Sequence, residues 1–559
     1  MNEFSETFFK RAGIIGISTF LSRILGFLRD AVIAMTFGAG LYSDIFFLCF
    51  RIPNLLRKLF SEGVLSISFI PVYTECLTNQ GKKNAFEMAR SAFFIISFFV
   101  SLFVIAGVVS APFIVKLILP QFQSDSYQFA LIVLLSRIML PYILCVSLLA
   151  LCMGILNSMG NFAAPAAAPV VLNIVIIFFA LIIAPRLKTP VAGLAIGVTA
   201  GGVLQLAMQI PFVLKTGFRF FKKTVFFHDK ALKAGRKLFP AMIGASGFQI
   251  NIFISTIMAS NLACGSISYL YYADRLVQFP LALFAVSGSI AAFPAFTEKA
   301  ALGKFNELTE QFAGLIKLVF FITIPSMAGL MVLRKPIVSL LFQYKAFDLN
   351  AAEGTGRALF FLCAGLWAFA GTRLFVNYFY ALSDTATPFK AGLVSIGINI
   401  VLSFFLMQTM GYEGLALSIS LSASINFFLL LKAAFSFSGS TLYNRHKAAL
   451  GLPGCSKEPE ILTNRTIEPN TSHLFLIKDI SISVCRSVLA SFIMYKVVYF
   501  ALSFVNFKDY SDKITILFAV TGCVILGIGV YAGCCAAMKS PEFALLKNIL
   551  NNRIFAIKN

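Results

Sequence analysis

Charged side chains that lie inside otherwise apolar segments are the residues of this sequence that could do chemistry. A charge near the middle of a bilayer costs about 2.5–3.5 kcal/mol even on a mild insertion scale, so such charges line water or pair with one another. The set consists of Arg23, Arg29, Asp30, Asp44, Arg51, Arg57, Lys58, Glu62, Arg137, Asp274, Arg275 and Arg373. Its cations outnumber its anions, which favours a positively charged cavity that binds an anion.

The spacing of these charges places several of them on common helix faces. Arg23 and Asp30 are about two helical turns apart, so they share one face. Arginine suits phosphate or carboxylate, because its planar guanidinium binds two oxygens at once. The alternative is a set of structural ion pairs, such as one between the neighbours Arg29 and Asp30.

Sequence patterns for the common kinds of enzyme are missing. The 3 His residues lie far apart, and the 11 Cys residues lie mostly in apolar runs, where they are expected to pack. Neither a Walker A motif nor a nucleophile elbow occurs. We therefore predict a protein without a metal site or a cofactor, a transporter and not an enzyme. A membrane transferase acting on a lipid phosphate is an alternative that would need carboxylates and a metal on a loop.

The elements that must position the charged set are membrane-spanning helices. Of the 559 residues 58% are hydrophobic and only 13% are charged, whereas about a quarter of a soluble chain is charged. A span needs about 20 mostly apolar residues, which gives about 14 spans and an all-α polytopic membrane protein. The expected spans are 12–36, 43–72, 90–119, 128–156, 163–184, 191–215, 238–261, 266–296, 308–333, 356–382, 388–409, 412–436, 479–504 and 513–538.

The net charge of +22 is explained by where the cations lie. Lysine and arginine are concentrated in alternate loops, as the positive-inside rule requires of cytoplasmic loops. Both termini are therefore predicted to be cytoplasmic, together with a polar loop at 437–477. Nucleic-acid binding, the other explanation of a basic chain, is not expected.

The chain also matches itself at an offset of roughly 223 residues. The run 68–75 aligns with 291–298, Pro165 aligns with Pro388, and the run that starts at Asn173 resembles the run that starts at Asn399. The duplication predicts a six-helix lobe over 1–225, a second over 226–436, and two further helices within 478–559. Two such lobes suggest alternating access around a central cavity, and a non-transporting scaffold is the alternative.

Glycines within the expected span 191–215 indicate where two helices approach closely. Gly193, Gly197 and Gly201 recur every helical turn and so share one face. We expect a neighbouring helix to pack against that face.

Several motifs resemble those of the MurJ (MviN) lipid II flippases. They are the runs 22–30 (SRILGFLRD), 37–40 (FGAG) with Asp44, 53–63 (PNLLRKLFSEG), 141–144 (PYIL), 156–157 (LN), 271–276 (YYADRL) with Phe279 and Pro280, and 341–344 (LFQY). The resemblance extends from about residue 12 to 436. It implies the multidrug/oligosaccharidyl-lipid/polysaccharide exporter fold, with two extra helices that form a groove for a lipid tail.

The resemblance also implies an activity and a set of site residues. Such a flippase moves undecaprenyl-diphosphate-linked peptidoglycan precursor, lipid II, from the cytoplasmic to the periplasmic leaflet of the bacterial inner membrane, and so serves cell-wall biogenesis and cell shape. Cell-wall synthesis proteins are candidate partners. Residues that match the essential cavity positions are Arg23, Arg29, Asp44, Arg57 and Arg275; Asp30, Lys58, Glu62 and Asp274 match neighbouring positions, and Arg373 falls where the family has a cation. Lys58 and Gln278 stand where other members have Arg and Glu.

The resemblance further bears on what drives transport. Some members bind sodium through acids on the seventh and eleventh spans. Here the eleventh span offers Asn399 and Ser403 instead, so the membrane potential is the expected driving force. The alternative function is a drug or polysaccharide exporter of the same fold, which would have an aromatic, acid-containing cavity.

Overall fold

The structure is a computed structural model of the chain, and in the residues it describes it is helical throughout, without a strand. The described residues are 2–59, 65–123, 125–222, 226, 228–232, 235, 249, 251–435, 471–505 and 512–548. The backbone alone is described for residues 2–17, 19, 58, 59, 65–68 and 471–477.

The chain folds into two compact units. Unit 1 comprises Met1–Ser268 and Phe342–Ala351, and unit 2 comprises Tyr269–Leu341 and Ala352–Asn559. The short segment Phe342–Ala351 belongs to unit 1 although unit 2 surrounds it in sequence. It packs there through Phe342, whose ring lies 5.6 Å from that of Phe27, and through the Ala346 N–H, which donates to the Met35 carbonyl at 3.2 Å.

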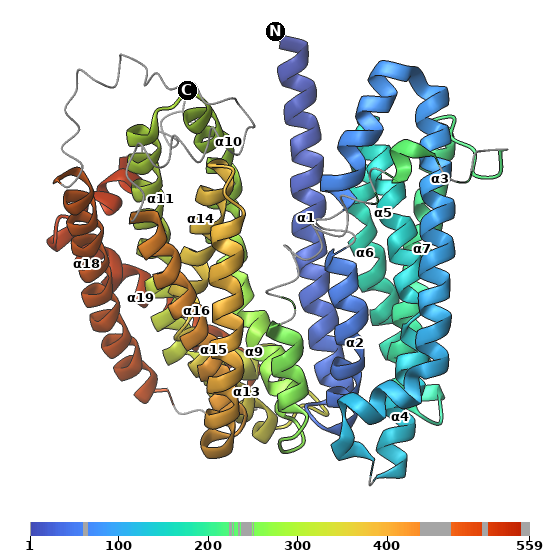
Figure 1. Cartoon of the computed structure of the whole chain (residues 1–559). Helices are drawn as coiled ribbons and strands as arrows, with labels where there is room; N and C mark the ends of the chain where they lie inside the picture. The colour runs from blue at the N-terminus through green and yellow to red at the C-terminus, as the bar shows by residue number, and fades with distance from the viewer. Residues whose placement is uncertain are drawn as a thin grey trace. The chain divides into compact units, whose positions relative to one another are not determined.

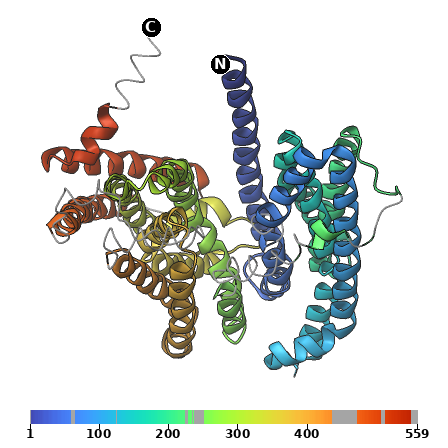
Figure 2. The ribbon, with the colours of Figure 1, turned by 45° about the horizontal axis from the view of Figure 1, so that its top comes forward.

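Unit 1 is a bundle of long helices. They are α1 (Asn2–Phe37), α2 (Leu41–Leu59), α3 (Leu65–Ile118), α4 (Ser126–Met139), α5 (Tyr142–Ser158), α6 (Ala163–Phe178) and α7 (Pro190–Lys215). A π-helical turn, Phe179–Ile183, continues α6. The long α3, which is broken at Gly81 with a φ of 79°, packs against α5 and runs along one side of the unit in both views (Figures 1 and 2).

The contact between α6 and α7 confirms the close approach that the glycines of α7 predict. A Cβ atom on Gly193 would lie 2.7 Å from the Ala184 Cα, and one on Gly201 would lie 2.6 Å from the Leu172 Cδ1. A Cβ on Gly197 would lie 2.8 Å from the Cβ of Phe179. At Gly193 and Gly197 a larger side chain would require the neighbouring backbone to move, whereas at Gly201 the Leu172 side chain would have to change its rotamer.

The helices that follow belong largely to unit 2. They are α9 (Ser266–Pro280), α10 (Ser287–Ala301), α11 (Phe305–Val332), α12 (Arg334–Phe342), α13 (Leu349–Cys363), α14 (Leu366–Ala381), α15 (Ala386–Met410), α16 (Tyr412–Phe435), α18 (Thr471–Ser503) and α19 (Lys513–Ala537). A π-helical segment, Leu281–Val286, joins α9 to α10. The C-terminal pair attaches through α18, which packs along α11 (Figure 1), and through the Tyr531 hydroxyl on α19, which donates to the Phe321 carbonyl at 2.7 Å.

The described residues contain 10 helices long and apolar enough to cross a membrane, or up to 11 if the bent pair α13 and α14 forms one span. The chain is thus an all-helical polytopic membrane protein. All but three of the expected spans coincide with these segments. Of those three, 12–36 lies on α1, 43–72 covers α2 and the start of α3, and half of 238–261 lies outside the described residues. Residues 437–470 of the predicted loop lie outside them as well, and its last part, 471–477, is not loop but the first two turns of α18.

Candidate functional site

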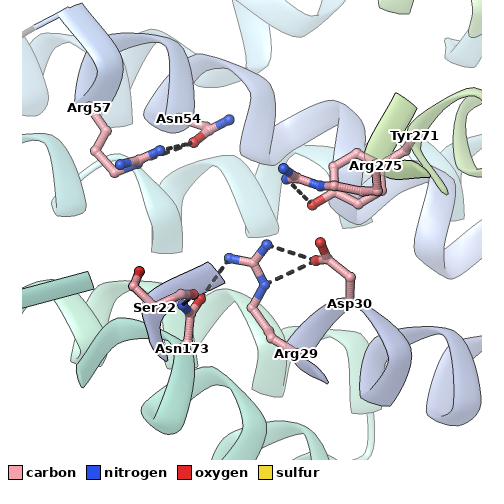
Figure 3. Close-up of polar contacts among 8 residues, drawn as sticks. All are labelled: Ser22, Arg29, Asp30, Asn54, Arg57, Asn173, Tyr271 and Arg275. Atoms are coloured by element: carbon pink, nitrogen blue, oxygen red, sulfur yellow. Dashed lines mark hydrogen bonds and ion pairs between the residues drawn. The ribbon is translucent and has the colours of Figure 1, made fainter. Parts of the chain in front are cut away.

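Arg29 is held in place by two partners inside unit 1. Its Nε and Nη2 donate to Asp30 Oδ1 at 3.0 and 2.7 Å, and its Nη1 donates to Asn173 Oδ1 at 3.2 Å (Figure 3). Asn173 lies on α6, and its Nδ2 donates to the Ser22 carbonyl of α1 at 3.2 Å. One asparagine therefore fixes both the backbone of α1 and the guanidinium that α1 carries.

Burial makes this contact set costly to disturb. Asp30 is 1% exposed, while Arg29 and Asn173 are 9% and 5% exposed. Buried ions need hydrogen bonds on their remaining atoms, and here the amide of Asn173 supplies one. The ion pair between Arg29 and Asp30, which the sequence offered as the alternative to an anion site, is present. Arg29 is therefore part of a preorganised polar cluster.

Apart from Arg137 on α4, the rest of the charged set in unit 1 was expected on the segment of α1 and α2. The Nε and Nη2 of Arg57 both donate to Asn54 Oδ1 at 3.2 Å, one turn back on α2 (Figure 3). Arg23 is an exposed side chain of α1. The side chain of Lys58 and the whole of Glu62 lie outside the described residues.

Asp44 reaches from the first turn of α2 to the start of α9. Its Oδ2 accepts from the Gly265 N–H at 2.6 Å, and its Oδ1 accepts from the Ser268 N–H at 2.8 Å and from the Ser268 hydroxyl at 2.6 Å. The first N–H groups of a helix have no partner within the helix, so a carboxylate there accepts their hydrogen bonds and interacts favourably with the helix dipole. Asp44 thus caps the helix that carries Asp274 and Arg275.

Unit 2 holds its own polar cluster on one face of α9. The Nη2 of Arg275 donates to the Tyr271 hydroxyl at 2.6 Å, and its guanidinium carbon lies 4.7 Å from the centre of the Tyr271 ring (Figure 3). Asp274 Oδ1 accepts from the Gln278 amide at 3.3 Å. The Asp274 carboxylate also acts electrostatically on Arg373, an exposed residue of α14.

Arg137, another member of the charged set, lies apart from these clusters. Its Nε donates to the Val108 carbonyl at 3.0 Å, and the residue is largely exposed. This contact with a backbone carbonyl indicates a structural role for Arg137.

Sequence reasoning missed the neutral residues that orient the arginines. In the sequence, Asn173 was noted only as part of the internal duplication. Asn54 and Tyr271 were noted only as members of the motifs. The spacing of Asn54 before Arg57 and of Tyr271 before Arg275, one helical turn in each case, was a usable signal. The contact of Asn173 with Arg29 joins distant segments and left no such signal.

Unit 2 also contains an apolar pocket of about 500 Å³ between α11, α14, α16 and α18. Aromatic rings form much of its wall, including those of Phe312, Phe320, Trp367 and Phe427. Val484 and Val488 of α18 close it on another side. In the described parts of the chain, no three His, Cys, Asp or Glu side chains gather in a way that could hold a metal ion.

Comparison with known proteins identifies one family. The family model described as lipid II flippase MurJ matches residues 33–446. A probable lipid II flippase MurJ of Buchnera aphidicola subsp. Acyrthosiphon pisum is 36% identical over 421 residues, which cover 75% of this chain and 82% of that protein. A lipid II flippase MurJ of Burkholderia cenocepacia is 33% identical over 419 residues, which cover 74% and 81%.

Solved structures agree with this assignment. A lipid II flippase MurJ in an inward closed conformation matches with a TM-score of 0.73 and 26% identity, over 94% of this chain and 98% of that one. A multidrug resistance MATE family transporter in an inward-facing conformation matches with a TM-score of 0.61 and 14% identity, over 77% and 96%. The second likeness shows a shared fold.

Proposed function

The chain belongs to the MurJ family and is a lipid II flippase, a transporter of peptidoglycan biosynthesis, and we propose that it carries its substrate by alternating access through a cationic cavity. The substrate is lipid II, in which an undecaprenyl diphosphate carries the disaccharide pentapeptide. We propose that transport runs from the cytoplasmic to the periplasmic leaflet of the bacterial inner membrane. The diphosphate is the part of this substrate that arginine recognises best, since the guanidinium pairs two oxygens at once.

The observation that carries the proposal is the fixed orientation of the buried Arg29. Asp30 and Asn173 hold its guanidinium from two sides at 2.7–3.2 Å. A binding group that is already oriented loses less conformational entropy when a ligand arrives. Arg275, held by Tyr271, would supply a second oriented guanidinium, while Arg23, Arg57, Lys58 and Arg373 would supply further positive charge. Asp30, Asp44, Glu62 and Asp274 would orient these cations or respond to their movement.

We further propose about 14 spans in two six-helix lobes, at 1–225 and 226–436, followed by a polar cytoplasmic segment at 437–477 and two helices within 478–559. The α1 and α2 helices and the segment 238–261 would supply the spans beyond those already counted. This arrangement places both termini in the cytoplasm. The membrane potential would drive transport by acting on the charged residues of the spans.

The apolar pocket of unit 2 suits the other end of the substrate. Its wall is almost wholly hydrocarbon, and one side of it is formed by α18, the first of the two C-terminal helices. We propose that part of the undecaprenyl chain occupies this pocket while the diphosphate is bound by arginine. Interactions with cell-wall synthesis proteins belong to the same proposal.

A complementation experiment tests the cationic site. Bacteria depleted of their own flippase would be supplied with this chain or with variants, and lipid II in each leaflet would be labelled. We expect Arg29→Ala and the double variant Arg57→Ala with Arg275→Ala to abolish growth and flipping. Arg137→Ala is the matched control, because Arg137 also lies in a span but contacts a backbone carbonyl. Normal flipping by the double variant would refute the cationic site.

A further inference from the structure

An ion pair joins α18 to α11 beside the apolar pocket. The Nζ of Lys317 lies 2.5 Å from Asp479 Oδ2. Lys317 belongs to the candidate span Phe305–Val332, and Asp479 stands near the start of the candidate span Lys478–Ser503. Lys317 is not a member of the charged set, although it is the kind of intramembrane charge that marks a functional site.

The pair lies where the pocket wall passes from one helix to the other. Ile316 and Ile480, the sequence neighbours of the two charges, both line the pocket. Further along the same two helices, Phe320 and Val484 continue the lining. A ligand chain lying in the pocket would therefore run past the Lys317 ammonium.

The two side chains differ in how exposed they are. The side chain of Lys317 is 19% exposed, whereas that of Asp479 is 45% exposed. The less exposed Lys317 ammonium depends more on an anion beside it, because removing one partner of a buried ion pair is destabilising. The more exposed Asp479 carboxylate can leave the pair more easily. Any ligand that separates the pair must bring a negative charge of its own.

We propose that Lys317 is a second phosphate-binding residue, at which the diphosphate of a polyprenyl-linked lipid replaces Asp479 while the lipid chain occupies the pocket. The ammonium group of lysine binds phosphate as a point charge, and the pocket supplies the apolar complement for the chain. This inference rests on the proposed function, since it takes the same substrate to a site outside the arginine clusters.

The exchange makes an asymmetric prediction about the two partners. If the ion pair only held α18 in place, removing either charge would have the same consequence for ligand binding. If Lys317 exchanges Asp479 for phosphate, loss of Asp479 frees the binding group and loss of Lys317 removes it. A double variant without either charge avoids an orphaned buried ion, so it isolates the contribution of the ammonium.

The experiment uses the full chain and a polyprenyl diphosphate with a photoreactive group on its hydrocarbon part. After illumination, the label is mapped to peptides of α18 that contain Val484 and Val488, so that only occupancy of the pocket is counted. The control probe is the matching polyprenol, which has no phosphate. Asp479→Asn is compared with Lys317→Gln combined with Asp479→Asn, and thermal unfolding checks that both variants fold.

We expect Asp479→Asn to label with the diphosphate probe at least as well as the unaltered chain. The double variant should need about tenfold more diphosphate probe for equal labelling, since a hydrogen bond to a charged group contributes at least that much. Its labelling by the polyprenol should not change. Equal diphosphate labelling of the two variants would overturn the inference. Competition by phosphatidylglycerol as strong as that by undecaprenyl diphosphate would overturn it too, and would assign the site to a bilayer phospholipid.

Leaflet-resolved labelling of lipid II in the same preparations separates this inference from the proposed function. Arg29→Ala is expected to stop flipping and to leave pocket labelling intact. If the chain flips lipid II but its pocket labelling does not depend on Lys317, the proposed function would stand and only this inference would be refuted. A chain that does not flip lipid II at all would refute the proposed function itself.

Discussion

Asn173 on α6 accepts a hydrogen bond from the Nη1 of Arg29 on α1 at 3.2 Å, and the same amide donates to the backbone of α1 at Ser22. A neutral residue thus sets the direction of a charged one. If Arg29 binds the substrate as proposed, Asn173 is a positioning residue, since it would act through the guanidinium of Arg29.

Asn173→Ala should lower the rate of lipid II flipping by about tenfold, because a hydrogen bond to a charged group is worth about 1.5–3 kcal/mol. Leaflet-resolved labelling measures the rate. Asn261→Ala is the matched control, since the exposed Asn261 amide donates to the carbonyl of Ile257, four residues earlier in the chain, and not to another helix. The apparent affinity for lipid II should weaken as well, a change that a loss of stability alone would not cause. Unaltered flipping and affinity would contradict the positioning role.

Asp44→Ala should destabilise the fold by about 1 kcal/mol, the usual cost of losing a helix N-cap, and should also reduce flipping. The cap lies on α9, which carries Arg275, so its loss would let that helix start fray. Thermal unfolding in detergent and leaflet-resolved labelling measure the two effects.

The control for Asp44 is another helix cap. Asp348 Oδ1 accepts from the Ala351 N–H at 2.7 Å and so caps α13, which carries none of the candidate site residues. Asp348→Ala should destabilise the fold to a similar extent and leave flipping per folded molecule unchanged. If both variants lost flipping equally, Asp44 would act only through stability.

The elements that were predictable from the sequence depend on local patterns. An apolar run of span length predicts a membrane helix wherever it occurs, and this rule located the described helices of span length between α3 and α19, but not the short α12. The glycine repeat of α7 also predicted a close contact from a local pattern, because the spacing of glycines along one helix is enough to show that they share a face. The expected span 356–382 is divided between α13 and α14, which are bent by 47°. The sequence has no proline or charge at this break, so the bend was not predictable.

The contacts within the candidate site were less predictable, because they join distant parts of the chain. Asp44 was selected as a charge inside a span, yet its partners Gly265 and Ser268 are about 220 residues away. Lys317 escaped selection, and its partner Asp479 lies on one of the two helices outside the duplication. Sequence alone selected the charged residues but not the neutral or distant groups that contact them.

Gly193→Ala should destabilise unit 1 by about 1–3 kcal/mol, the usual cost of overpacking. The new Cβ would lie 2.7 Å from the Ala184 Cα, a backbone atom that cannot turn aside. Gly201→Ala should cost less, because its Cβ meets the end of the Leu172 side chain, which has other rotamers. Gly392→Ala on α15 is the control, since nothing lies within 4 Å of its Cβ position. Thermal unfolding should rank the three in this order, and an unchanged stability of Gly193→Ala would contradict the close contact of α7 with Ala184, which follows α6 in the chain.

Substitution of Tyr271 should reduce flipping in two steps, because this residue holds Arg275 in two ways. Tyr271→Phe keeps the ring 4.7 Å from the guanidinium and loses the 2.6 Å hydrogen bond, so we expect a moderate loss of about fivefold to tenfold. Tyr271→Leu loses the ring as well, and a cation–π contact adds about 0.5–2 kcal/mol, so flipping should fall further. Tyr499→Phe, at an exposed position of α18, is the control. Equal rates for the Phe and Leu variants would show that the ring does not orient Arg275, and an unchanged rate for Tyr271→Phe would assign the orientation of Arg275 to the ring alone.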